Sequence, residues 1–189
     1  MDATLEQLAE RGEDAITLRG ITDAAEANVA AVSYHFGSLK SLRDAAIEHA
    51  LERYLDAQRD AVLPIGPAST LAEVAAGFGG PMMRALAAGG RELAVMRIVA
   101  RVATNPPAGW ERLGAKFDQI RAMILPALRA NLPGVEDEEL VFRSRCVAGL
   151  LNWLVLAPIG VELGNEPAGQ VERLVVPVLA GAFRGTSTG

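Results

Sequence analysis

The sequence predicts an all-α protein with a short N-terminal helix-turn-helix domain and a longer C-terminal helical domain. Apolar residues recur at helical spacing almost throughout the chain, and the period-two alternation typical of strands is absent. Aromatic residues make up only 5% of the 189 residues, whereas Ala, Leu and Val are abundant, which favours helices over sheets. Breaks rich in Gly and Pro, such as PIGP at 64–67, separate the chain into segments of helix length.

Four helices are expected in the first 63 residues. The first covers about residues 3–11 and ends at a glycine. Thr17, Asn28 and Ser38 have side chains that commonly cap helix N-termini, and each precedes one of the next three helices. The fourth helix is long and covers about residues 39–63.

The second and third of these helices, joined by the stretch AEA at 25–27, form a helix-turn-helix candidate. The third lies in NVAAVSYHFGS at 28–38, which contains no Lys, Arg, Asp or Glu. The second helix of such a motif enters a DNA groove about 12 Å wide. Small side chains at Ala30, Ala31 and Ser33 would allow that close approach.

The two ends of this stretch suit different tasks. Tyr34 and His35 have O–H and N–H donors that suit phosphate oxygens where the helix leaves the groove. Val29, Val32 and Phe36 are expected to point inward and hold the helix on its domain.

The run ITLRGITDAAEANVAAVSYHFGSLKSL at 16–42 resembles the DNA-binding domain of the TetR/AcrR family of bacterial one-component repressors. The similarity covers about residues 2–50 and rests on the Tyr-His-Phe end, the following Gly-Ser and the long helix. It implies phosphate contacts at the start of the second helix, base contacts from the third, and backbone contacts from its end and the start of the fourth. The residues that it implies for DNA binding are Thr17, Arg19, Asn28, Ala30, Ala31, Ser33, Tyr34, His35 and Lys40.

Several positions depart from the family pattern. Glu26 stands where a turn glycine is usual, which would cost roughly 1 kcal/mol if that position has positive φ. Ala27 replaces a larger apolar residue, and Lys40 comes one place late. The sequence begins almost at the first helix, so either its true start differs or less phosphate attraction than in relatives is expected, because the family's usual basic arm would precede this helix. Residues 1–50 contain four basic and nine acidic side chains, so this segment carries a charge of −5. Because phosphate contacts supply most non-specific affinity for DNA, a relative with weak or lost DNA binding is the alternative.

The expected helices of the second domain cover about 69–88, 90–104, 108–131, 136–163 and 167–184. The last two are apolar on every side, which indicates cover by the chain's own core on one face and by a second subunit on the other. Two such helices per chain would form a four-helix dimer interface, and the resemblance implies the same. A dimer would present two recognition helices to half-sites about 34–36 Å apart or more. The residues expected at this interface are Val147, Leu150, Leu151, Leu154, Val171, Leu174, Val175 and Val178.

A ligand pocket is also expected in the second domain. It would be mostly apolar, so a hydrophobic or amphipathic small molecule is the expected effector. FGGPMMR at 78–84 would interrupt its helix, and prolines at 126, 158 and 177 lie inside others; such kinks either open cavities or adjust packing. The residues expected to line the pocket, with plain core packing as the alternative for each, are Phe78, Met82, Met83, Met96, Trp110, Phe117 and Trp153. The arginines that could pair with an acidic ligand, unless they lie on a solvated surface, are Arg91, Arg97, Arg101 and Arg121.

The function expected is a ligand-responsive transcriptional regulator, a repressor that acts as a homodimer on double-stranded DNA in the cytoplasm. An enzyme is disfavoured because no nucleophile, base and acid converge, and no cofactor or metal site is indicated. Cys146, the only cysteine, is expected to pack in the core, with a redox role as the alternative. The expected domains are residues 1–46 for DNA binding and 47–184 for ligand binding and dimerisation, with a frayed tail at 185–189.

Overall fold

The computed structural model describes residues 1–11, 15–106, 111–157, 162–163 and 166–185. These residues form helices and turns without any strand, which confirms the all-α prediction. The helices are α1 (Asp2–Arg11), α2 (Leu18–Ala24), α3 (Val29–Phe36), α4 (Leu39–Val62), α5 (Leu71–Ala88), α6 (Gly90–Thr104), α7 (Glu111–Asn131), α8 (Asp137–Leu156) and α10 (Ala168–Arg184). None of these helices has the length and apolar character that a membrane span requires.

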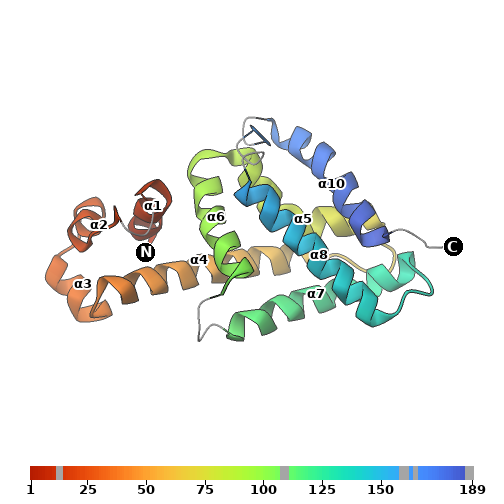
Figure 1. Ribbon diagram of the computed structural model, residues 1–189, viewed down its shortest axis with the longest axis horizontal. Coiled ribbons are helices and arrows are strands. Elements are labelled where there is room, and N and C mark those ends of the chain that lie inside the picture. The colour runs from red at the N-terminus through yellow and green to blue at the C-terminus, as the bar shows by residue number, and fades with distance from the viewer. Residues whose placement is uncertain (12–14, 107–110, 158–161, 164–165, 186–189) are drawn as a thin grey trace.

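The long helix α4 connects the two ends of the molecule (Figure 1). Helices α1, α2 and α3 gather around its N-terminal half, while α5, α7, α8 and α10 form a bundle around its C-terminal half. Helix α6 packs on both groups, because it contacts α1 as well as α5 and α8. The fold therefore places a small helical head and a larger helical body on one shared helix.

The starts of α2, α3 and α4 follow from local capping chemistry. Thr17, Asn28 and Ser38 all have extended backbones, and each is the N-cap residue of its helix. Each side-chain oxygen accepts a hydrogen bond from a backbone N–H two or three residues later, at 2.8–3.1 Å. These three predicted helix starts are confirmed.

Two expectations about helix breaks are wrong. Helix α5 runs unbroken through Gly79, Gly80 and Pro81. A Cβ at Gly79 would lie 3.0 Å from a methyl carbon of Leu179, so this glycine permits close packing of α10 on α5. Helix α8 ends at Leu156 rather than near position 163, because its C-cap Ala157 precedes a proline and has an extended backbone.

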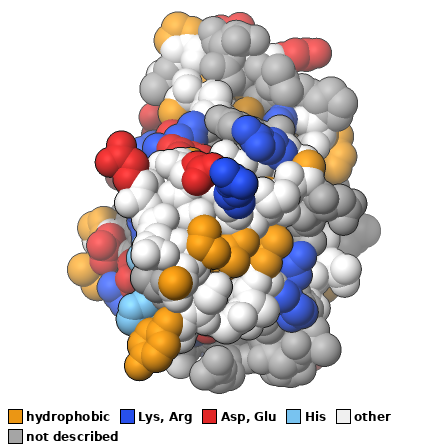
Figure 2. Space-filling model, turned by 90° about the vertical axis from the view of Figure 1, so that its left-hand side faces the viewer, with side chains coloured by type: hydrophobic (Ala, Val, Ile, Leu, Met, Phe, Trp, Pro, Cys, Tyr) orange, Lys and Arg blue, Asp and Glu red, His pale blue; other side chains and the backbone are white. Residues whose placement is uncertain are grey.

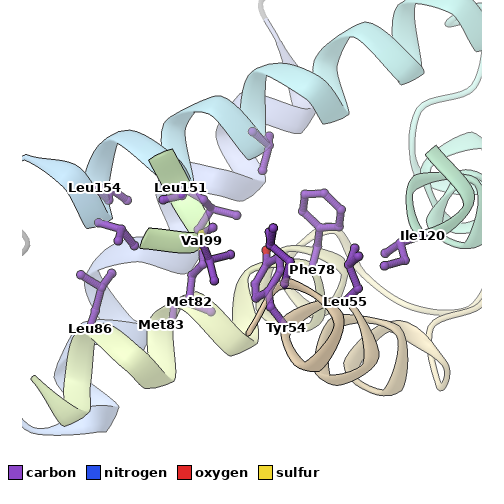
Figure 3. Close-up of a cluster of buried hydrophobic side chains, with 14 of the residues drawn as sticks. Tyr54, Leu55, Phe78, Met82, Met83, Leu86, Val99, Ile120, Leu151 and Leu154 are labelled. Carbon is purple, nitrogen blue, oxygen red and sulfur yellow. The ribbon is translucent and has the colours of Figure 1, made fainter. Parts of the chain in front are cut away.

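One apolar core extends from the head into the body. Tyr54 of α4, Phe78 and Met82 of α5 and Leu151 of α8 meet near its centre (Figure 3). The rings of Phe78 and Phe183 pack edge to face, with centroids 6.0 Å apart. This core fixes α4, α5, α8 and α10 against one another and surrounds a cavity.

Candidate nucleic-acid interface and ligand cavity

Helix α3 exposes most of its surface at the end of the head. Tyr34 is 87% exposed, and its ring packs edge to face on His35 at 5.4 Å, so the two rings project together. Ala30 and Ser33 are exposed as well. Figure 2 views this end of the molecule and shows hydrophobic side chains beside a histidine, with basic and acidic side chains interspersed.

The inner side of α3 is narrow. Val32 and Phe36 are half-buried and pack against the core, as expected. Val29 is 43% exposed, so the expectation that it points inward is wrong. It is the first residue of α3 and follows the exposed stretch 23–28, so the helix stands away from the core at this end. Ala31 lies on α3, and its side chain is outside the described part of the structure.

The expected phosphate-binding residues are exposed beside α3, but they already have local partners. The Lys40 ammonium lies 2.6 Å from the Asp44 carboxylate, and Arg19 Nε lies 3.9 Å from that of Asp23. Burial disfavours the charge on Asp44, yet hydrogen bonds from Lys40 and Arg43 outweigh it and lower the pKa of this carboxyl. Each cation has more N–H donors than its carboxylate partner uses, so donors remain for a phosphate.

Thr17 and Asn28 are exposed at the starts of α2 and α3, where their side-chain oxygens cap the helices. The Asn28 oxygen accepts from the Ala30 N–H, so its amide NH₂ group is the part suited to an additional donor contact. Capping and DNA contact can thus use different atoms of the same side chain.

The turn between α2 and α3 contains the only positive-φ residue other than glycine in the described part of the chain. Glu26 has φ 50°. Its N–H bonds the Asp23 carbonyl at 3.3 Å, and the Ala27 N–H bonds the Thr22 carbonyl at 2.9 Å. This is the Schellman pattern that ends a helix, with Glu26 at the left-handed position that glycine usually occupies.

The expected dimer-interface residues divide into inner and outer sets. Five of them are core residues of the single chain with at most 9% exposure, so their assignment to an outer surface is wrong: Val147, Leu151, Leu154, Val171 and Val175. They lie on the sides of α8 and α10 that pack against the body. Leu150 is half-buried, whereas Leu174 and Val178 are 47% and 55% exposed.

The outer face of α8 carries apolar residues that were not expected at an interface. Phe142 and Trp153 are 64% and 56% exposed, and Cys146 between them is exposed, so its expected core position is also wrong. The spacings of four and seven residues place all three on one side of the helix. With Leu174 and Val178 of α10, they form the outer stripe. The sequence signal for these outer residues was a second apolar stripe on a helix that is already apolar on its inner side.

The body contains a cavity of about 170 Å³ between α4, α5, α6, α7 and α8. Three expected ligand residues line it: Phe78, Met82 and Phe117. The residues that sequence reasoning missed are Tyr54 and Gln58 of α4 and Asn152 of α8, because nothing in their local patterns marks a cavity. Burial raises the pKa of the Tyr54 phenol, so it stays protonated at neutral pH.

A second, more open cavity of about 390 Å³ adjoins the first, and Ala103, Arg121, Ala148 and Asn152 line both. Trp153, also expected at the ligand site, lines this outer cavity. Met83 and Met96 line neither; they pack in or against the core. Trp110 lies outside the described residues.

An exposed helix-turn-helix head joined by one long helix to a hollow helical body defines the class of one-component DNA-binding regulators. The family model "Bacterial regulatory proteins, tetR family" matches residues 1–46, and "Tetracyclin repressor-like, C-terminal domain" matches residues 76–181. The chain belongs to the TetR family of transcriptional regulators.

Solved structures with this fold include two from bacteria. The TetR family transcriptional regulator PfmR from Thermus thermophilus is 17% identical, with a TM-score of 0.68 over 95% of each chain. A TetR-like transcriptional regulator from a Rhodococcus species is 18% identical, with a TM-score of 0.65 over 95% of this chain and 90% of the other. No curated protein matches the sequence.

Proposed function

We propose that the protein is a homodimeric repressor that leaves its operator when an apolar or amphipathic small molecule enters the body. The observation that carries this proposal is the exposure of α3 together with a cavity lined by α4, the helix to which α3 is joined. Family membership supports a DNA-binding transcriptional regulator. Features of α3, the outer stripe and α4 support the proposal that it is a homodimeric repressor released by a ligand.

In this proposal α3 is the recognition helix that contacts the DNA bases. The exposed side chains of Ala30 and Ser33 are short, so the helix backbone can approach base edges. Tyr34 and His35 project from its C-terminal end and donate to phosphates, as do Arg19 and Lys40 beside it. Direct readout is thus confined to one turn of helix, and the surrounding donors set its register.

In this proposal the outer stripe forms the dimer interface. Large apolar side chains such as Phe142 and Trp153 rarely stand exposed together unless another surface covers them. Two copies of α8 and α10 related by a twofold axis would bury the stripe against itself in a four-helix arrangement. The same axis would pair the two copies of α3.

In this proposal α4 and α6 couple ligand binding in the body to DNA binding by the head. Tyr54 and Gln58 of α4 line the cavity, and Lys40 lies at the other end of the same helix. Helix α6 also links body and head, since Arg91 lies 2.6 Å from the Glu6 carboxylate on α1. A ligand that moves the protein from 99% bound form to 1% must prefer the released form by about 5.5 kcal/mol.

An electrophoretic mobility shift with the full chain and duplex from its own upstream region tests the proposal. We expect a shift at low salt that Tyr34→Ala and Lys40→Ala weaken. Lys116→Ala is the matched control, because Lys116 forms a comparable exposed ion pair with Glu52, at 3.2 Å, on the body. Absence of any shift by a folded dimer would refute the proposal.

A dimeric ligand-binding module without DNA affinity is the second candidate. The charge of −5 on residues 1–50 and the carboxylates beside Arg19 and Lys40 favour it. The same experiment separates the two, because such a module would dimerise normally and shift no duplex even at low salt.

A further inference from the structure

Arg121 of α7 is the charged residue that lines both cavities. Its side chain is only 13% exposed. One terminal nitrogen donates to the Asp118 carboxylate, but the buried Nε makes no hydrogen bond to any described residue. A buried donor without an acceptor is costly, so this site lacks an acceptor that a bound molecule could supply.

The charge at this point is positive. Asp118 serves two guanidinium groups, because Arg145 of α8 also donates to it, at 3.4 Å. The hydrogen bond from Arg121, which outweighs the opposing effect of burial, lowers the pKa of the Asp118 carboxyl, so it is ionised at neutral pH. One carboxylate thus faces two permanent cations, which leaves one positive charge for an anion.

Most of the other residues that line the inner cavity are apolar, and Gln58 and Asn152 are the polar exceptions. Tyr54, Phe78, Met82 and Phe117 form much of its wall. A cavity of about 150 Å³ with such a lining holds a benzene molecule. The 170 Å³ here therefore fits one aromatic ring or a short alkyl chain.

The other arginines that the sequence suggested for an acidic ligand have different positions. Arg91 pairs with Glu6, and Arg97 donates to the carbonyl of Val155 at 3.0 Å. Arg101 is exposed and lines neither cavity. Of the four, only Arg121 combines burial, an unsatisfied donor and a cavity.

We propose that the effector is a small amphipathic carboxylic acid. Its carboxylate accepts hydrogen bonds from Arg121 at the junction of the two cavities, and its ring or alkyl chain fills the inner cavity. A neutral ligand could satisfy Nε but would leave the extra positive charge unpaired. This inference rests on the proposed function only in that the bound acid acts as the effector. The binding site itself does not depend on DNA binding.

Isothermal titration calorimetry of the full-length protein tests the proposal, with 3-phenylpropanoate and octanoate as probes and 3-phenylpropan-1-ol and octan-1-ol as their neutral matches. We expect each acid to bind at least tenfold more tightly than its alcohol, because charge-assisted bonds are about twice as strong as neutral ones. Arg121→Met should weaken acid binding at least tenfold and leave alcohol binding within threefold. Arg173→Met, an exposed arginine of α10 away from both cavities, should change neither.

Arg121→Lys guards against misfolding of the Met variant, because it keeps the charge and loses the Nε donor; we expect intermediate binding of the acids. Equal binding of acids and alcohols, or no effect of either Arg121 variant in a folded protein, would overturn the proposal. Mobility shifts with the same probes separate the two proposals. Acid binding without DNA release contradicts only the repressor mechanism, whereas release by the alcohols alone contradicts only the carboxylate.

Discussion

Replacement of Glu26 by glycine should stabilise the protein, because Glu26 occupies a backbone conformation that favours glycine. Its φ of 50° costs a residue with a Cβ atom about 1–2 kcal/mol. Glycine removes this cost but adds about 0.5–1 kcal/mol of unfolded-chain entropy. Glu26 is exposed, and the two Schellman hydrogen bonds use only backbone atoms, so glycine keeps both.

The difference between these ranges is about 0–1.5 kcal/mol in the free energy of unfolding, and its midpoint of about 0.75 kcal/mol corresponds to about 1.5–3 °C in Tm for a chain of this size. Urea titration followed by circular dichroism measures it. Glu26→Ala is the matched control, because it removes the same charge and keeps the strain; we expect no gain in stability from it.

The two variants also separate strain from charge in DNA binding. Both remove a carboxylate from the turn before α3, so both should raise affinity for duplex DNA to a similar extent, and more at low salt than at high salt. If Glu26→Gly proved no more stable than Glu26→Ala, the reasoning from backbone strain would be refuted.

Three further predictions concern other parts of the molecule. Because the folded protein lowers the pKa of Asp44, its ion pair with Lys40 stabilises the fold above about pH 4, and this stabilisation is lost as pH falls through the lowered pKa. Asp44→Asn should therefore reduce the loss of Tm in acid. It should also strengthen DNA binding in anisotropy titrations. Val178→Asp should yield folded monomers in sedimentation velocity, whereas persistence of the dimer would contradict the role of the outer stripe. Thr70→Ala should lower the free energy of unfolding by about 1 kcal/mol in urea titrations, since it removes the capping box with Glu73, and an unchanged value would contradict that role.

The helix starts of the head could be predicted because capping is local. Whether Thr17, Asn28 or Ser38 caps a helix depends on the next three residues, all of which can be read from the chain. The positive φ at Glu26 could be anticipated from the family resemblance instead, because Glu26 stands where a turn glycine is usual.

The outer face of α8 could not be chosen from the sequence. Both Leu151, which is buried, and Trp153, which is exposed, belong to a helix that is apolar on every side. Periodicity gives the angle between two stripes but not which one the chain's own core covers. That choice depends on how α5 and α10 pack on α8, which is a tertiary property.

The cavity depends on even longer-range information. Tyr54, Phe78 and Arg121 come from three different helices, and no local pattern brings them together. From the sequence, Phe78 was one of several large apolar residues and Arg121 was one of four arginines. Burial and the missing partner of the Arg121 Nε, which single this residue out, appear only in three dimensions.

Protection of guanine N7 from dimethyl sulfate tests most directly whether α3 reads duplex DNA, because this atom lies in the major groove. With the full-length protein on its upstream duplex, we expect two protected clusters with centres about 10–10.5 base pairs apart or at a multiple of that spacing, and their loss in Tyr34→Ala. A folded dimer that binds the duplex without protecting major-groove guanines, or with protection unchanged in Tyr34→Ala, would contradict the assignment of α3 as the recognition helix.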